Sequence, residues 1–213
     1  HGLTTVDAVS ATENHSDYCT TQKALMELGA VVCTSRSPRC DQCPLVAQCS
    51  WRHAGYPRGM DTGVLRQWFA DHQRDLPWRH PGTTAWQILV SEFMLQQTPV
   101  SRVIPAWQAW CERWPTPTAL AQASLGEVLT QWGKLGYPRR ARNMHQTATR
   151  IDTECGGEVP SDVETLESLP GIGTYTARAI ACFAFGAPVP AVDTNVKRVV
   201  ARAEEGTADG GHW

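Results

Sequence analysis

Apolar residues recur along this chain at the three- and four-residue spacing of amphipathic helices, and no segment shows the strict alternation of a half-buried strand. Proline and glycine separate the apolar segments, so the connections between them are short. Short connections between helices are typical of a compact all-α fold. The pattern predicts helices at Thr21–Leu28, Gly63–Gln73, Ala85–Leu95, Ser101–Trp114, Thr116–Ala123, Leu125–Leu135, Arg139–Ile151, Asp162–Ser168, Gly173–Phe185 and Asn195–Arg202.

Length, composition and net charge restrict the size of the fold and the classes of function to be considered. With 213 residues, 42% hydrophobic and 19% charged, the chain can bury a core in one domain or two small ones. The net charge is −2, so binding of nucleic acid would depend on a local basic surface. No apolar run is long enough to span a bilayer, and the first residues do not resemble a signal peptide. Eight cysteines could indicate a secreted disulfide scaffold, but apolar helical segments dominate and four of the cysteines cluster, so we expect a reduced, cytoplasmic compartment.

One segment is rich in basic residues. Lys134, Arg139, Arg140, Arg142 and Arg150 lie within 17 residues that contain no acid. Such charge gives affinity for a phosphate backbone without regard to base sequence. An aromatic residue in a Gly-Tyr-Pro turn just before the arginines could wedge between bases. A solvated helix face explains the charge equally well.

A second segment, LPGIGTYTARAIACFAFG, places two glycines directly before a helix. Gly171 and Gly173 allow a tight turn and the close approach of another molecule. The amides at the start of the following helix can donate to a phosphate. The preceding helix has a candidate N-cap in Asp162, so the segment is a candidate helix-hairpin-helix. The alternative is an ordinary turn with a glycine at the helix end.

Two carboxylates lie in apolar surroundings, Glu92 in SEFMLQQTPV and Asp193 in VDTNVKR. If they share a pocket, their pKa values separate, and one acts as an acid while the other stays an anion. The alternative is a pair of helix-terminal charges, because Asp193 is also a good N-cap for the helix that follows.

Four cysteines occur in a C-x6-C-x2-C-x5-C pattern, at Cys33, Cys40, Cys43 and Cys49. Four thiolates in so short a loop can bind one metal centre, and both zinc and iron–sulfur clusters accept four. The pattern alone favours neither. The other four cysteines are expected to be buried structural thiols, and tryptophans such as Trp78, Trp86, Trp107, Trp110 and Trp132 are expected to pack between helices.

Together these motifs resemble the adenine DNA glycosylase (MutY) family of the helix-hairpin-helix glycosylase superfamily. The resemblance covers about Gly63–Arg202 and Thr21–Pro57, and rests on SEFMLQQTPV, WGKLGYPRRARN, LPGIGTYTARAIACFAFG, VDTNVKRVVAR and the cysteine segment. It implies an all-α fold with a six-helix barrel subdomain and an iron–sulfur subdomain. It also implies one 4Fe–4S cluster on the four cysteines, with a structural and DNA-associated role.

The resemblance implies a role for each matching residue. Glu92 would protonate the adenine at N7, and Asp193 would stabilise the oxocarbenium-like sugar. Tyr175 and Asn195 match supporting positions of that pocket. Gln97 and Tyr137 match residues that intercalate near the flipped base. Further contacts to DNA are expected from Arg139, Arg140, Gly171, Ile172, Gly173 and Lys197.

The order of the motifs departs from the family, in which the cysteine loop follows the DTNVKR helix. We therefore expect a circularly permuted or reordered chain, in which Met60 is the natural start and Arg202 continues naturally into His1. The expected organisation is an iron–sulfur segment with a join (1–59), an N-terminal helix packed on the cluster subdomain (60–84), the helical barrel with the hairpin and catalytic residues (85–202), and a frayed tail (203–213).

The expected activity is hydrolytic removal of adenine mispaired with 8-oxoguanine or guanine. Endonuclease III-like lyases carry a lysine where this chain has Tyr175, so a monofunctional glycosylase is favoured. A bifunctional or thymine-directed glycosylase and an inactive DNA-binding iron–sulfur module remain the alternatives. The printed sequence lacks a Nudix-like segment, so weaker discrimination of the opposite base is expected. The partner is expected to be double-stranded DNA, bound by a monomer at the bacterial nucleoid.

Overall fold

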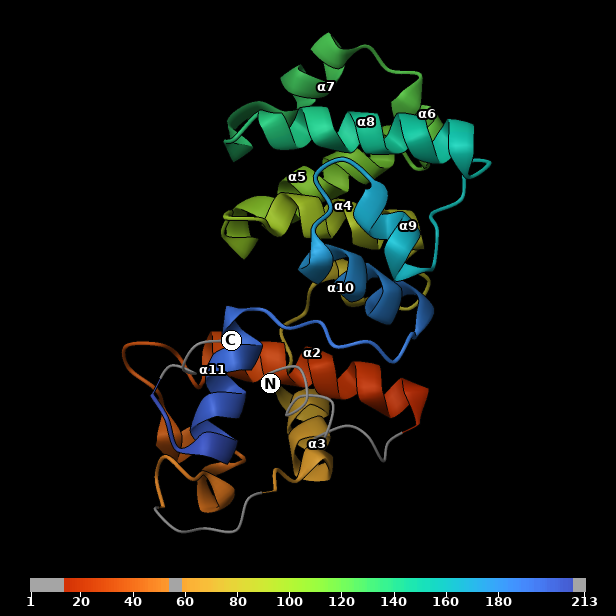
Figure 1. The fold of residues 1–213 in the computed structure, drawn as a ribbon. Coiled ribbons are helices and arrows are strands. Elements are labelled where there is room, and N and C mark those ends of the chain that lie inside the picture. The colour runs from red at the N-terminus through yellow and green to blue at the C-terminus, as the bar shows by residue number, and fades with distance from the viewer. Residues whose placement is uncertain (1–13, 54–58, 209–213) are drawn as a thin grey trace. The chain divides into compact units, whose positions relative to one another are not determined.

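The computed structural model describes residues 14–53 and 59–208, and within these ranges it is helical with no β-strand (Figure 1). The chain forms two compact units. The first unit contains the described residues up to Arg74 together with those from Gly186 onward, and the second contains Asp75–Phe185. The all-α prediction is therefore confirmed. In the described ranges no helix has the length and apolarity that crossing a bilayer requires.

The first unit is built around a long helix, α2 (His15–Val31). Both α3 (Thr62–His72) and α11 (Thr194–Val200) pack against it, although they come from distant parts of the sequence (Figure 1). Their apolar faces close one core with the cysteine loop, which contributes Leu45. The buried members of this core are Ala24, Leu25, Leu28, Val32, Leu45, Leu65, Phe69, Val196, Val199 and Val200.

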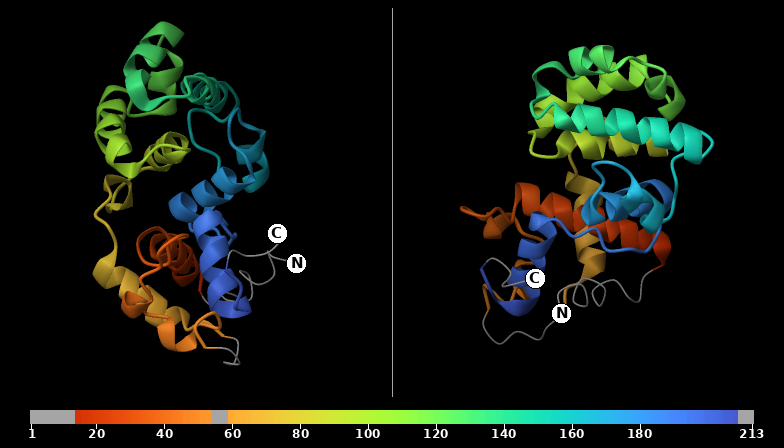
Figure 2. Two further views of the ribbon diagram at one scale, coloured as in Figure 1. Left: turned by 90° about the vertical axis from the view of Figure 1, so that its left-hand side faces the viewer. Right: turned by 45° about the horizontal axis from the view of Figure 1, so that its top comes forward.

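The second unit contains the helices between Asp75 and Phe185. In chain order they are α4 (Ala85–Leu95), α5 (Val100–Arg113), α6 (Pro117–Ala121), α7 (Leu125–Trp132), α8 (Arg139–Glu154), α9 (Val163–Ser168) and α10 (Thr174–Phe185). Helix α4 packs against α5 and α10, and α8 packs against α6 and α7 (Figure 2). All five tryptophans expected to pack between helices are buried. Trp110 makes edge-to-face contacts with Trp114 and Trp132, at centroid distances of 4.7 and 5.7 Å.

Side-chain caps fix where several helices begin. Thr84 and Ser124 form capping boxes at the starts of α4 and α7, and Asp162 accepts from the Thr165 amide at the start of α9, as predicted. Helix α2 begins six residues before the predicted Thr21, because Asn14 accepts from the amide of Asp17 and caps it there.

The structure differs from the expected organisation at two places. The expected barrel segment, 85–202, is divided between the units at Gly186. The start of the expected frayed tail is ordered, because Ala201–Glu205 forms a π-helical turn in which Ala203 and Glu204 are buried. Most of the expected join, Gly55–Gly59, and the residue His1 lie outside the described ranges, so the permuted order stays a prediction.

Candidate functional site

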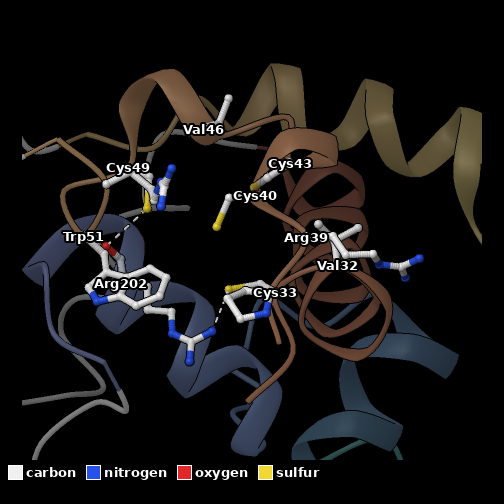
Figure 3. A pocket seen from close by; sticks show the side chains of 11 residues that line it. Val32, Cys33, Arg39, Cys40, Cys43, Val46, Cys49, Trp51 and Arg202 are labelled. Carbon is white, nitrogen blue, oxygen red and sulfur yellow. Dashed lines mark hydrogen bonds between the residues drawn. The ribbon is translucent and has the colours of Figure 1, made fainter. Parts of the chain in front are cut away.

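The four cysteines of the C-x6-C-x2-C-x5-C pattern line one hollow in the first unit. Short 3-10 turns at Cys40–Gln42 and Val46–Gln48 fold the loop back on itself, so that cysteines sixteen residues apart face the same space. Figure 3 shows the sulfurs around this hollow, which holds about 290 Å³ of space including its open mouth. It is also lined by Val32, Pro38, Arg39, Val46, Trp51, Arg52 and Arg202.

The hollow fits an iron–sulfur cluster better than a single zinc ion. A tetrahedral zinc ion holds its sulfurs at about 2.3 Å, which would draw all four close together. In the described residues no three His, Cys, Asp or Glu side chains come together closely enough to hold one metal ion. A four-iron cluster takes the same four thiolates at a wider spacing. The donor set of four thiolates around one hollow therefore suits the cluster.

Burial changes the protonation of these thiols. It is the main cause that raises the pKa of Cys43 from 9.0 to about 11, and the neighbouring cysteines add to it while a backbone hydrogen bond at Leu45 opposes it. Burial also raises the pKa of Cys33, against a hydrogen bond from Arg202 that lowers it. Binding of a metal centre to this loop must therefore release protons.

One buried arginine holds the first part of the cysteine loop. Arg202 is only 3% exposed and donates to the carbonyl oxygens of Thr34 and Ser35 at 2.8 and 3.1 Å. It also donates to Sγ of Cys33 at 3.5 Å and lies over the Trp51 ring at 4.7 Å (Figure 3). The predictions from sequence missed this residue. Its signal was the i, i+4 spacing of Arg198 and Arg202, which puts both on one helix face.

Asp193 is the N-cap of α11, and its carboxylate is held from two sides. Oδ1 accepts from the amide of Val196 at 2.8 Å, and Oδ2 accepts from the side-chain amide of Asn195 at 2.9 Å. Asn195 in turn accepts from Arg198 at 2.7 Å, and Arg198 donates to the carbonyl oxygen of Cys33 at 2.7 Å. The half-buried carboxylate is therefore connected through two side chains to the first cysteine of the loop.

The remaining predicted pocket residues are divided between the units. Glu92 lies on α4 with only 8% of its surface exposed, and Tyr175 is half-buried in the first turn of α10, both in the second unit. Asp193, Asn195 and Lys197 belong to the first unit. That Glu92 and Asp193 share one pocket therefore stays a prediction.

The predicted hairpin is present between α9 and α10, and its first glycine is required by the backbone. Gly171 has a φ of +79°, and a Cβ there would meet side-chain atoms of Asn143 at 2.7 and 2.8 Å. Gly173 has open space around it. The side chain of Ile172 is buried, and its amide donates to the carbonyl oxygen of Leu169, so both stabilise the hairpin. The expected contact of Ile172 with DNA stays a prediction.

Gln97 and Tyr137 share an uncommon backbone conformation. Among the described residues they are the non-glycine positions with positive φ, at 57° and 48°. For residues with a Cβ this region costs energy, and such strain gathers at functional sites. Both side chains are exposed, Tyr137 at 61%. The two residues expected to intercalate are thus held outward on strained turns.

The two arginines predicted to contact DNA have different surroundings. Arg139 is exposed in the first turn of α8. Arg140 is only 8% exposed, and its guanidinium donates to backbone carbonyl oxygens of the same unit. The two side chains differ because i and i+1 positions of a helix face different directions, and the expected contact of Arg140 with DNA stays a prediction.

Two protein families match the sequence. The HhH-GPD superfamily base excision DNA repair protein family matches residues 90–209, more than half of the chain. The iron–sulfur binding domain of endonuclease III matches residues 33–49, which are the four cysteines and the residues between them. The cysteine loop is therefore an iron–sulfur binding loop, and it precedes the HhH-GPD segment in this chain.

Curated relatives agree with the family match. The chain is 65% identical over 145 residues to an adenine DNA glycosylase of Mycolicibacterium smegmatis, covering 68% of this chain and 50% of the relative. It is 58% identical over 155 residues to that of Mycobacterium tuberculosis (73% and 51%) and 44% identical over 155 residues to that of Homo sapiens (69% and 28%). The chain spans about half the length of the mycobacterial relatives that it matches.

Solved structures show the same fold. A thermostable thymine-DNA glycosylase aligns with a TM-score of 0.59 at 27% identity, covering 63% of this chain and 62% of that one. A non-covalent endonuclease III–DNA complex aligns with a TM-score of 0.55 at 27% identity, covering 66% and 70%. The chain belongs to the HhH-GPD superfamily of base excision DNA repair proteins.

Proposed function

We propose that this chain is a monofunctional glycosylase that hydrolyses the N-glycosidic bond of adenine mispaired with 8-oxoguanine or guanine in double-stranded DNA. The observation that carries the proposal is the buried carboxyl of Glu92 on α4, in a chain 65% identical over 145 residues to an adenine DNA glycosylase. A buried carboxyl in an apolar helix is suited to donate a proton, because burial disfavours its charged form.

In the proposed reaction Glu92 protonates N7 of the extruded adenine, so that the base leaves as a neutral molecule. Positive charge then develops on the sugar, and the Asp193 carboxylate stabilises it. Both oxygens of that carboxylate accept hydrogen bonds, from Val196 and Asn195. These bonds fix the orientation of the carboxylate in advance, so that no free energy is needed to orient it during the reaction. Glu92 then helps to position the attacking water.

Binding of DNA is assigned to exposed groups of the second unit. The turn at Gly171 and Gly173 offers backbone to a phosphate, and Arg139 and Arg142 add positive charge on the exposed side of α8. Gln97 and Tyr137 enter the duplex beside the extruded base. The protein acts as a monomer, and its site of action is the bacterial nucleoid because its substrate is chromosomal DNA.

The residue type at position 175 supports hydrolysis rather than lyase chemistry. A lyase of this superfamily needs an amine nucleophile at that place to form a Schiff base, and Tyr175 has none. Lys197 lies on α11 in the same unit as Asp193 and is the alternative amine. The proposal therefore predicts base release without coupled strand cleavage.

The cysteine loop is assigned one 4Fe–4S cluster, held by Cys33, Cys40, Cys43 and Cys49. When bound, such a cluster supplies four metal–thiolate bonds and a site of electron transfer, but no group for proton transfer to a base. Arg202 and Arg198 hold the backbone at the first of these cysteines. The loop thus stabilises the unit that carries Asp193.

The decisive experiment replaces Glu92 with Gln. Single-turnover base release is measured on duplexes with A:8-oxoguanine, A:G and T:G pairs, and DNA affinity is measured on the same duplexes. We expect E92Q to lose base release from both adenine duplexes by at least about 100-fold, since a general acid alone contributes roughly 10²–10⁴-fold. DNA affinity should stay within about threefold.

The control is Glu112→Gln, which changes an exposed glutamate on α5 and should release adenine at the wild-type rate. Release of thymine but not adenine by the wild-type chain would replace the proposal with a thymine glycosylase. Equal activity of E92Q and wild type would remove Glu92 from the mechanism. Borohydride trapping that depends on Lys197 and accompanies efficient strand cleavage would instead indicate a lyase.

A further inference from the structure

The two strained turns of the second unit lie on separate loops. Gln97 lies in residues 96–99, between α4 and α5, and Tyr137 lies in residues 135–138, before α8. We call these segments the two wedge loops. Each holds a non-glycine residue at positive φ, which persists only where surrounding contacts stabilise it. The contacts that stabilise the two turns therefore also determine how the side chains of Gln97 and Tyr137 are held.

On the side of the first wedge loop, the contacts come from the Arg140 guanidinium. It donates to the carbonyl oxygens of Phe93 and Met94 at 3.2 and 3.0 Å and also to that of Gln96. It donates to the Thr98 hydroxyl oxygen at 2.8 Å. The last carbonyls of a helix lack partners within the helix and carry its negative dipole end, so a buried cation is well placed there. These acceptors lie on both sides of Gln97 in the sequence.

On the side of the second wedge loop, the same guanidinium donates to the carbonyl oxygens of Leu135 and Gly136, at 3.2 and 3.1 Å. These are the two carbonyls directly before Tyr137. The guanidinium also lies 5.5 Å from the centre of the Tyr137 ring and 5.1 Å from that of Trp132. One side chain therefore binds the backbone of both wedge loops and contacts the ring that one of them exposes.

Arginine is suited to this position in a way that lysine is not. Its planar guanidinium presents donors in a fixed fork, so it can bond to acceptors on two sides at once. An ammonium group is a single point with three donors and cannot span the same set of carbonyls. Burial lowers the pKa of Arg140, but arginine stays charged at neutral pH. The buried charge is compensated here by carbonyl dipoles and aromatic rings.

We propose that Arg140 is a positioning residue for base extrusion: it links the two wedge loops so that Gln97 and Tyr137 enter the duplex as one unit. The inference rests on the proposed function, because it assumes that these side chains intercalate. Arg140 itself touches no DNA in this account. Arg140 acts through the turns that it holds. The effect of substituting Arg140 should therefore be lost when the side chains of Gln97 and Tyr137 are removed.

The experiment measures extrusion directly, without base release. All proteins are full-length and carry Glu92→Gln, and the duplex carries the fluorescent adenine analogue 2-aminopurine opposite 8-oxoguanine. Its emission rises when it leaves the stack. The series comprises the E92Q parent and the same protein with Arg140→Lys, with Tyr137→Ala, with Gln97→Ala, and with Arg140→Lys combined with each alanine substitution. Affinity for an undamaged duplex is measured in parallel.

We expect Arg140→Lys to lower the equilibrium constant for extrusion by about tenfold, while affinity for undamaged duplex stays within about twofold, because phosphate contacts dominate that affinity. In the Tyr137→Ala and Gln97→Ala backgrounds, Arg140→Lys should add less than about twofold, since residues acting as a unit are not additive. Arg113→Lys, at an exposed position of α5 with no assigned contact to DNA, is the matched control. If Arg140→Lys lowers the extrusion equilibrium constant by the same factor in the alanine backgrounds as in the parent, the inference is overturned.

Two further outcomes separate this inference from the proposed function. If the E92Q parent gives no rise in emission, extrusion itself fails and both are overturned. If the parent extrudes the base and Arg140→Lys extrudes it equally well, only the inference is overturned. Should Arg140→Lys not fold, Thr98→Val serves in its place, because it removes one acceptor of Arg140 and keeps the side-chain shape. Wild-type extrusion by T98V would likewise contradict the proposal.

Discussion

Asn195 donates its side-chain amide to Oδ2 of Asp193 at 2.9 Å. The same amide group accepts from Arg198 through its oxygen, so Asn195 sits between a half-buried carboxylate and a cation bonded to the cysteine loop. A carboxylate at a helix N-cap is usually explained by the cap alone. Here the second carboxylate oxygen, Oδ2, accepts from a side chain that an N-cap does not require. This extra hydrogen bond favours a functional role for the orientation of the Asp193 carboxylate.

The first prediction concerns that donor. Asn195→Ala leaves the cap bond from the Val196 amide in place but removes the second hydrogen bond to the carboxylate. A hydrogen bond to a charged group contributes about 1.5–3 kcal/mol, so we expect single-turnover adenine release to fall roughly 10- to 100-fold. Iron content should be unchanged, because Arg198 keeps its bonds to the carbonyl oxygens of Cys33 and Gly29. Thr194→Ala, at an exposed neighbouring position, is the control and should react at the wild-type rate.

The second prediction concerns the contact between α2 and α11. A Cβ at Gly29 would meet Cβ of Asn195 at 2.6 Å and its carbonyl oxygen at 2.9 Å. Gly29→Ala should therefore destabilise the first unit by about 1–3 kcal/mol in urea unfolding, as overpacking does. Gly126→Ala on α7 meets nothing closer than 4.0 Å and should stabilise the protein by about 0.5–1 kcal/mol, because alanine favours the helix. Equal effects of the two substitutions would contradict the close packing.

Much of the helical architecture follows from the sequence pattern, because apolar periodicity and proline or glycine breaks are local signals. Helix α4 has the predicted bounds, Ala85–Leu95, and a capping box sets its start. Four of the six extra residues at the start of α2 are polar, so the apolar periodicity is weak there, and the start of the helix is set by the Asn14 cap. The π-helical turn after α11 depends on long-range contacts: the Ser50 and Trp51 amides donate to the carbonyl oxygens of Ala203 and Arg202.

The candidate site could be predicted where a sequence motif carries the chemistry. It could not be predicted where the role of a residue depends on the direction in which its side chain points. Four closely spaced cysteines indicate a metal centre without any structure, and they do line one hollow. Arg139 and Arg140 are equivalent as sequence, yet one is exposed and the other is buried. What separates them is which side of α8 faces α4, and that is set by the packing of the whole unit.

The third prediction concerns the hairpin. Gly173 has open space where a Cβ would lie, whereas the hairpin proposal brings a DNA backbone close to this point. Gly173→Ala should therefore leave the melting temperature nearly unchanged and weaken binding to undamaged duplex by roughly tenfold, the equivalent of about 1.4 kcal/mol. Gly171→Ala is the comparison, because positive φ and contact with Asn143 should make it destabilising with or without DNA. Duplex affinity of G173A at the wild-type level would remove the second glycine from the DNA interface.

The fourth prediction concerns removal of the cluster and its dependence on pH. Without metal, Cys43 titrates at about 11 in the folded loop but at 9.0 as an ordinary thiol. The folded loop then binds its proton more tightly than the unfolded chain does, so the stability that this proton contributes is complete below pH 9 and is lost as pH rises through 11. Chelated protein should accordingly lose α2 and α11 helicity more readily at pH 10.5 than at pH 8, measured by hydrogen exchange.

Cluster binding has the opposite dependence, because the thiols must lose their protons to become ligands. Apparent iron affinity should therefore rise between pH 7 and pH 9, measured by competition with a chelator whose own titration is corrected for. Cys43→Ser removes one ligand and should abolish most iron retention, whereas Cys111→Ser, in the other unit, should retain iron as wild type does. Iron affinity that is flat over this pH range would mean that the loop binds metal with its thiols already ionised, against the burial that raises the pKa of Cys33 and Cys43.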